Sequence, residues 1–278
     1  MTLITEHSLK AAILRLPGAS TLQRLLRRRR SAAQFRHEFE AFKRLSDSAE
    51  PGRKFDLLWE DRHPCLEDRT ATTGFDRHYV YHTAWAARTV SQRRPAQHMD
   101  IGSSLYFCGI LSAFVPVRFY DYRPADLRLD NLASSAADLL RLPFPDGSVE
   151  SLSCMHVVEH VGLGRYGDPP DPDGDRKAMH ELRRVLAPGG ELLFVVPVGR
   201  PRICFNAHRI YGFHQVLEAF ADLQLKEFAL IPDDPAMGGL VSNPPEAVVA
   251  LQNYGCGCFC FRKPAKRLPD SIAGTTQR

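Results

Sequence analysis

The chain of 278 residues is 44% hydrophobic and 24% charged, and its glycine and proline contents are ordinary. This composition suits one large globular domain with an appendage, and it excludes collagenous, largely disordered and disulfide-scaffold proteins. The net charge of +4 is uneven, because residues 1–50 hold ten Lys and Arg against five Asp and Glu while the rest is nearly neutral. We therefore expect no nucleic-acid-binding surface on the main domain.

Apolar runs in the chain are too short to span a bilayer, which takes roughly 20 residues. The longest are residues 108–117 and 192–198, and Lys10 and Arg15 interrupt the N-terminal stretch where a secretory signal would lie. The seven scattered cysteines do not have the pattern of a disulfide framework. The sequence therefore predicts a soluble, cytoplasmic protein.

Residues 1–50 form a basic arm that we expect to be helical. Four apolar side chains follow one another at spacings of three or four residues, as on one face of a helix: Phe35, Phe39, Phe42 and Leu45. Together with the arginines at 27–30, this stripe suits a helix that binds a membrane surface or an acidic partner. We favour the commoner alternative, a helix packed on the main domain with solvated arginines. Residues 51–96 are expected to be a helical lead-in.

From residue 97, short apolar strands alternate with amphipathic helices, the pattern of an α/β sheet. We expect strands at 97–101, 117–120, 149–155, 191–198, 225–231 and 254–262, and helices at 105–114, 175–186 and 215–223. The two consecutive strands at the end indicate an antiparallel hairpin. The predicted fold is a Rossmann-like three-layer sandwich over residues 97–263, with about seven mostly parallel strands and the last antiparallel. A flexible tail is expected at 264–278.

Three aspartates follow predicted strands or their connections, where ligands bind in such sheets. Asp100 opens a loop of small residues that includes Gly102. Asp121 ends the next strand, nineteen residues after Gly102, which suits a carboxylate that binds the hydroxyls of a ribose. Asp138 could accept a hydrogen bond from an adenine amino group. The ordered set indicates a nucleoside site.

Residues 79–263 resemble class I S-adenosylmethionine-dependent methyltransferases, and among them an uncharacterised bacterial methyltransferase-like domain-of-unknown-function family. The resemblance rests on Leu142-Pro143-Phe144 and on residues 155–160 (MHVVEH), 181–190 (ELRRVLAPGG) and 208–217. It implies S-adenosylmethionine as the cofactor and methyl transfer to a small-molecule or saccharide acceptor.

The resemblance also implies roles for individual residues. Those implied to bind the cofactor are Asp100, Gly102, Ser103, Ser104, Asp121, Tyr122, Asp138, Leu139 and Met155. His156 and His160 border the methyl-transfer site and are candidate general bases, or structural histidines of the loop. A helix over 70–85 would close over the cofactor with His78, Tyr79 and His82, or pack in the core, as we favour for Trp85.

One departure from the family pattern keeps alternatives open. Of the three alternating glycines in the first loop of the superfamily only Gly102 is present, and Ser104 and Tyr106 occupy the other positions. The chain could therefore be a non-catalytic Rossmann-like module of a glycan-assembly pathway. It could also be a nucleotide-sugar-dependent transferase that uses the same aspartates.

Further polar clusters have two interpretations each. Four residues after the strand 191–198 are candidates to bind a polar acceptor: Asn206, His208, Arg209 and Tyr211. The glycine- and proline-rich segment 162–170 could be a lid or a plain connection. Residues 156–160 formally match an inverted zinc-protease motif, and the cysteines of 256–260 could ligate a metal. For residues 156–160 we favour the end of a strand, and for residues 256–260 a strand of the core. We therefore expect no metal.

Overall fold

The structure, a computed structural model, describes residues 19–48 and 55–265. The chain divides into two compact units, Met1–Gly74 and Phe75–Arg278. Parts of two expected segments, residues 1–18 of the arm and 266–278 of the tail, lie outside the described residues. Within the described ranges, no helix combines the length and the apolar character needed to cross a membrane.

The first unit contains one long helix, α2 (Ala19–Asp47). Two side chains of the predicted stripe, Phe35 and Phe39, contact Trp59 of the same unit, with ring centroids 6.1 and 4.9 Å apart. Phe42 and Leu45 are exposed. Among its described residues, the expected helical lead-in over 51–96 is helical only over Arg77–Arg93. Residues 55–76 form neither helix nor strand, and nearly all of their side chains are exposed, so they have no buried apolar face to stabilise a helix.

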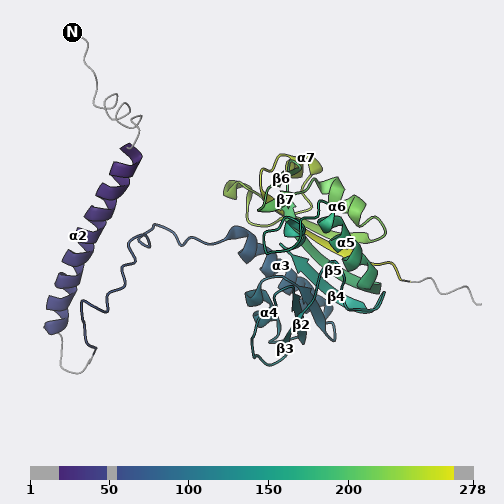
Figure 1. The fold of residues 1–278 in the computed structure, drawn as a ribbon, viewed down its shortest axis with the longest axis horizontal. Coiled ribbons are helices and arrows are strands. Elements are labelled where there is room, and N and C mark those ends of the chain that lie inside the picture. The colour runs from purple at the N-terminus through teal and green to yellow at the C-terminus, as the bar shows by residue number, and fades with distance from the viewer. Residues whose placement is uncertain (1–18, 49–54, 266–278) are drawn as a thin grey trace, which may run out of the picture. The chain divides into compact units, whose positions relative to one another are not determined.

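The second unit is built on an eight-stranded sheet of order β3-β2-β1-β4-β5-β10-β8-β9. In that order the strands are Leu132–Ala136, Val117–Asp121, His98–Ile101, Val149–Met155, Leu186–Val198, Gly255–Arg262, Gln224–Ile231 and Val241–Ser242. Figure 1 labels four of these strands, β2, β3, β4 and β5. The first five pair in parallel. β10, the last strand of the chain, runs antiparallel to both β5 and β8. The predicted mostly parallel sheet with an antiparallel last strand is confirmed.

Helices cover both faces of this sheet, as the three-layer prediction requires. α3 (Arg77–Arg93) and α4 (Leu105–Leu111) contribute to one core cluster, and α5 (Gly174–Val185) and α6 (Phe213–Ala219) to the other. Strand β10 separates the two clusters by alternation, since its cysteines belong to the first and its phenylalanines to the second. Three of the cysteines are therefore core residues, as favoured from the sequence: Cys256, Cys258 and Cys260.

Each helix and strand predicted over residues 97–263 is present; β4 has the predicted ends, and the others are shifted at one or both ends. α5 ends at Val185, before the Pro188-Gly189 pair, because β5 already begins at Leu186. Strand β3 was not predicted, since it lies at the sheet edge and buries only Leu132. The other elements missed are short: β6 (Arg202–Cys204), β7 (His208–Ile210), β9, α7 (Glu246–Ala250), and the 3₁₀ turns η1 (Val158–His160) and η2 (Pro235–Met237).

Candidate functional site

A pocket of about 500 Å³ opens at the carboxyl edge of the parallel strands, within the second unit. Its walls follow β1, β2, β3 and β4, the place where ligands bind in sheets of this kind. Six residues singled out from the sequence line it: Gly102, Asp121, Tyr122, Asp138, Leu139 and His160. These residues are distant in sequence, and the parallel topology brings them to one cavity.

The loop after β1 turns at Gly102, whose φ is 70°. This left-handed conformation favours glycine, and a Cβ there would lie 3.1 Å from Cγ1 of Val157. Ser104 has an ordinary φ of −66° and precedes α4, and Tyr106 lies in that helix with its side chain 88% exposed. Of these three positions only that of Gly102 has a φ that favours glycine, and neither Ser104 nor Tyr106 lines the pocket.

Beneath this loop lies a buried polar network. Oδ1 of Asp100 accepts a 2.9 Å hydrogen bond from the Ser103 amide, and Oδ2 accepts one from the Ser153 hydroxyl. The Ser103 hydroxyl in turn accepts a 3.1 Å hydrogen bond from the Met155 amide. Burial raises the pKa of Asp100 to about 6. Asp100, Ser103 and Met155 do not line the pocket. The buried side chains of Asp100 and Ser103 instead hold the loop in place through hydrogen bonds.

Asp121 and Asp138, two of the aspartates that line the pocket, each hold their own turn with one carboxylate oxygen. Oδ1 of Asp121 accepts a 2.7 Å hydrogen bond from the Arg123 amide, and Oδ1 of Asp138 accepts a 2.9 Å hydrogen bond from the Leu140 amide. In both, Oδ2 accepts no hydrogen bond from residues 19–48 or 55–265. Two acceptor oxygens are thus available at neighbouring strand ends for hydroxyl or amino donors of a ligand.

The segment 162–170 covers one side of the pocket. Gly162, Tyr166 and Asp168 line it, and the Asp168 carboxylate accepts a 2.7 Å hydrogen bond from the Gly162 amide and a 3.2 Å bond from that of Tyr166. The guanidinium of Arg123, which comes from the other side of the pocket, lies 4.6 Å from the centre of the Tyr166 ring. Tyr166 and Arg123 were not singled out from the sequence. The composition of the 162–170 loop was a signal for Tyr166, and Arg123, which lies outside that loop, had no comparable signal.

A second cavity of about 370 Å³ adjoins the pocket, since His160 and Tyr166 line both. Its other walls include His78, Tyr79, His156 and Tyr254, so α3 does bring two of the expected lid residues to the site. His160 is held by its Nδ1, which donates to the Ala207 carbonyl over 2.6 Å. Burial lowers the pKa of His160, so at neutral pH its Nε2 keeps a lone pair that can take up a proton.

The two candidate bases therefore occupy different surroundings. His156 lines the second cavity and not the first pocket. Its Nδ1 donates a 2.8 Å hydrogen bond to Oε1 of buried Glu159. His82 is fully buried, and burial lowers its pKa to about 3. Trp85 packs in the core and donates a 2.7 Å hydrogen bond to Glu227, as favoured for this residue.

The four predicted acceptor residues do not act as one group. Asn206 is exposed, and His208 packs against Tyr254 with ring centroids 4.8 Å apart. Buried Arg209 donates to the carbonyls of Val161, at 2.6 Å, and Pro172, at 3.2 Å. The Tyr211 hydroxyl donates to Asp175 over 2.9 Å. Arg209 and Tyr211 therefore lie outside the acceptor site that the sequence suggested, because their polar groups are engaged in holding the loop and α5.

Comparison with known proteins gives partial matches. Residues 146–224 match the family model described as Caenorhabditis protein of unknown function, DUF268. A demethylmenaquinone methyltransferase of Thermus thermophilus is 31% identical over 121 residues, 43% of this chain and 42% of that protein. An uncharacterized protein of Methanocaldococcus jannaschii is 30% identical over 99 residues, 34% of this chain and 37% of its own length. The matches thus span about two fifths of these relatives.

Solved structures of methyltransferases are among the matches to the fold. The N-methyltransferase NodS of Bradyrhizobium japonicum, in complex with S-adenosylhomocysteine, is 19% identical with a TM-score of 0.47, over 68% of this chain and 88% of NodS. The 1,6-didemethyltoxoflavin-N1-methyltransferase of Burkholderia thailandensis is 13% identical with a TM-score of 0.49, over 66% and 79% of the two chains. The resemblance to methyltransferases noted in the sequence agrees with the 31% identity to the demethylmenaquinone methyltransferase over 43% of this chain.

Proposed function

We propose that this protein transfers the methyl group of S-adenosylmethionine to a nucleophilic atom of a small-molecule or saccharide acceptor. The observation that carries the proposal is one pocket in which the left-handed Gly102 loop, Asp121 and Asp138 meet. The partial match to a curated methyltransferase supports it.

The residues present fit this cofactor. Gly102 leaves the space that a Cβ would fill, so a ligand can approach the backbone closely. Asp121 is placed to accept hydrogen bonds from ribose hydroxyls, and Asp138 to accept one from an adenine amino group, each through its available Oδ2. Leu139, which is buried in the same wall, offers an apolar surface to a base. A volume of about 500 Å³ is in the range of small-molecule and cofactor sites.

The chemistry asked of the chain is modest. S-adenosylmethionine, when bound, supplies a methyl carbon that is already activated by its positively charged sulfur. The protein has to orient an acceptor, exclude water and receive the proton that an acceptor hydroxyl loses. His160 lines both cavities, and its Nε2 is the atom we assign to this proton. Tyr166 and the 162–170 segment limit the access of water.

Calorimetric titration of the full chain with S-adenosylhomocysteine tests the proposal. We expect one site with a micromolar Kd, and no comparable heat from NAD or from a nucleotide sugar with or without Mn²⁺. Binding of the nucleotide sugar alone, dependent on the metal, would instead support the sugar-transferase alternative. A folded sample that binds none of these ligands at millimolar concentration would support the non-catalytic alternative.

A further inference from the structure

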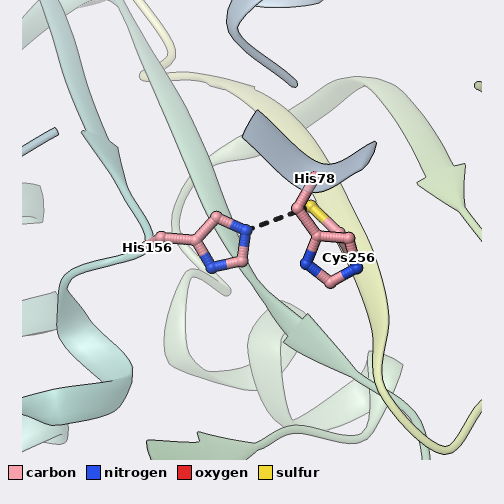
Figure 2. Close-up of side chains that lie close together, drawn as sticks. All are labelled: His78, His156 and Cys256. Atoms are coloured by element: carbon pink, nitrogen blue, oxygen red, sulfur yellow. Dashed lines mark hydrogen bonds between the residues drawn. The ribbon is translucent and has the colours of Figure 1, made fainter. Parts of the chain in front are cut away.

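Three potential metal ligands meet in the second cavity and its wall. His78 comes from the first turn of α3, His156 follows β4, and Cys256 lies at the start of β10 (Figure 2). One donor atom of each lies within 4.8 Å of the donor atoms of the other two. Since β10 is antiparallel, its first residues lie at the carboxyl edge of the parallel strands, and this topology brings Cys256 to His156.

The separation between two of these atoms already suits a bound zinc ion. Sγ of Cys256 lies 3.4 Å from Nε2 of His156, and the thiol donates a hydrogen bond to this nitrogen that a zinc ion would replace (Figure 2). Zinc bonds of about 2.3 Å to sulfur and 2.0–2.1 Å to nitrogen, at a tetrahedral angle, place the two atoms about 3.6 Å apart. The His78 ring stacks on His156 with centroids 5.3 Å apart, so it must turn about its side-chain bonds to complete the set. His78 is only half-buried, which leaves it room to turn.

The surroundings have the features of a second coordination shell. The Nδ1 hydrogen of His156 is directed to Oε1 of Glu159 over 2.8 Å, which leaves the lone pair of Nε2 facing Cys256. Carboxylates commonly orient zinc-binding histidines in this way. Glu159 is itself buried, and its Oε2 has no hydrogen-bond partner within the described ranges. A positive ion beside His156 would compensate this buried carboxyl group.

A further buried nitrogen without a partner lies next to the cluster. Nδ1 of His82 donates to the His78 carbonyl over 2.6 Å, so its Nε2 carries a lone pair. That Nε2 is buried and has no hydrogen-bond partner in the part of the chain that the structure describes. The His82 ring packs against His156 with centroids 5.1 Å apart. Buried polar atoms are rarely left unpaired, and Nε2 of His82 and Oε2 of Glu159 give His156 a polar setting that suits a bound ion.

We propose that His78, His156 and Cys256 bind one Zn²⁺ ion, with the fourth coordination position open to the second cavity. Binding converts the Cys256 thiol to a thiolate and releases its proton to solvent. Three protein ligands and one open position are the arrangement of zinc sites that bind water or a substrate atom. If the proposed function holds, on which this step rests, the open position would receive the oxygen or sulfur of the methyl acceptor. The second cavity shares His160 and Tyr166 with the cofactor pocket, so this atom would lie next to the cofactor.

Metal binding by the full chain, treated with a chelator and then dialysed, tests this site without S-adenosylmethionine. We expect one Zn²⁺ per chain with a Kd below micromolar, and with Co²⁺ the near-ultraviolet absorption of a thiolate–cobalt bond. Cys256→Ser should abolish that absorption and weaken Zn²⁺ binding at least about 100-fold. Cys260→Ser is the matched control, because Cys260 is equally buried and belongs to the same core cluster, and it should retain both.

Two further variants keep the test decisive if Cys256→Ser does not fold. His78→Ala, at the half-buried end of α3, should weaken Zn²⁺ binding to the same extent, and Glu159→Gln should weaken it about 10- to 100-fold. The proposal is overturned if the unmodified chain binds Zn²⁺ no more tightly than folded His78→Ala, or if its Co²⁺ form shows no thiolate absorption. Zinc binding without S-adenosylhomocysteine binding would leave the site standing and reject the proposed methyl transfer.

Discussion

Gly102 lies directly beside Asp121. A methyl group on Gly102 would be 3.4 Å from Oδ2 of Asp121, the oxygen that no described residue uses as a hydrogen-bond acceptor. The loop that must approach the cofactor and the carboxylate that must bind its ribose are thus neighbours across two parallel strands. The proposed cofactor site therefore depends on the free space between Gly102 and the Asp121 carboxylate.

Gly102→Ala is therefore expected to impair cofactor binding beyond its effect on stability. The left-handed φ of 70° costs a non-glycine residue roughly 1–2 kcal/mol, and the new methyl group crowds Val157 and Asp121. We expect the Kd for S-adenosylhomocysteine to rise at least about tenfold, or 1.4 kcal/mol, by calorimetry. Gly147→Ala is the control, because its φ is 64° and the nearest atom to its Cβ lies 3.5 Å away, outside the pocket. Equal affinity in the two variants would contradict the assignment.

Tyr211→Phe is expected to lower stability and leave cofactor affinity unchanged. The substitution removes the hydrogen bond to buried Asp175 and should reduce the free energy of unfolding by about 1–3 kcal/mol. Urea unfolding measures this loss, and Tyr106→Phe, at a ring that is 88% exposed, should show none. A selective loss of acceptor affinity in Tyr211→Phe at unchanged stability would restore the acceptor role that the sequence suggested.

His98 is expected to make the protein less stable in mild acid. Its ring is buried between the hydroxyls of Ser151 and Ser153, and burial lowers its pKa from 6.5 to about 3. The unfolded chain takes up a proton on His98 below about pH 6.5 and the folded chain does not. Its contribution is therefore complete above pH 6.5 and declines from there towards pH 3, by up to about 1.4 kcal/mol per pH unit.

Asp100 acts in the opposite direction over part of this range. Its pKa is raised to about 6, so the folded chain takes up a proton before the unfolded chain does, and stability rises as the pH falls through 6 towards 3.8. In His98→Asn we therefore expect a smaller loss of unfolding free energy between pH 6.5 and 4 than in the unmodified chain. Ser151→Ala, which removes a hydrogen bond and no titrating group, should keep the original slope. An unchanged slope in His98→Asn would show that His98 is not held neutral.

Tyr166→Ala is expected to open one side of the pocket without unfolding the chain. The ring is 42% exposed, and the contacts that it loses are those with the guanidinium groups of Arg123 and Arg165 and with the His160 ring. Contacts of this kind are worth about 0.5–1 kcal/mol, so the Kd for S-adenosylhomocysteine should rise about 2- to 5-fold. Tyr106→Ala serves as the control, since Tyr106 lies outside the pocket lining. A larger effect of Tyr106→Ala would mean that the loop at 162–170 does not cover the cofactor.

The sheet could be predicted because its central strands bury both faces and contain continuous apolar runs. Leu192, Phe194 and Val196 on β5 are fully buried, and a short unbroken run of such residues is typical of a central parallel strand. Strand β3 had no such pattern, since Ser134 and Ser135 take the places of apolar residues at the sheet edge. An edge strand is specified by pairing with its neighbour, and that pairing is invisible in its own composition.

The sequence could predict a residue of the candidate site only where its position allowed one role and not both a ligand-binding and a structural one. Gly102 and Asp121 were found because they follow the ends of predicted strands, and Asp138 was found through the resemblance to methyltransferases, because the strand before it was not predicted. Arg209 gave the same polar signal as a ligand-binding residue, and only the carbonyls around it reveal a structural role. The grouping of His78, His156 and Cys256 required the place of β10 in the sheet, which residue spacing does not contain.

The most direct test of the account is the binding of S-adenosylhomocysteine to Asp121→Ala, with Asp126→Ala as the exposed control outside the pocket lining. We predict that Asp121→Ala, folded by circular dichroism, raises the Kd about 10- to 100-fold, the loss expected for hydrogen bonds to a charged group. Asp126→Ala should bind as the unmodified chain does. Equal affinities in all three proteins would contradict the assignment of this pocket to the cofactor.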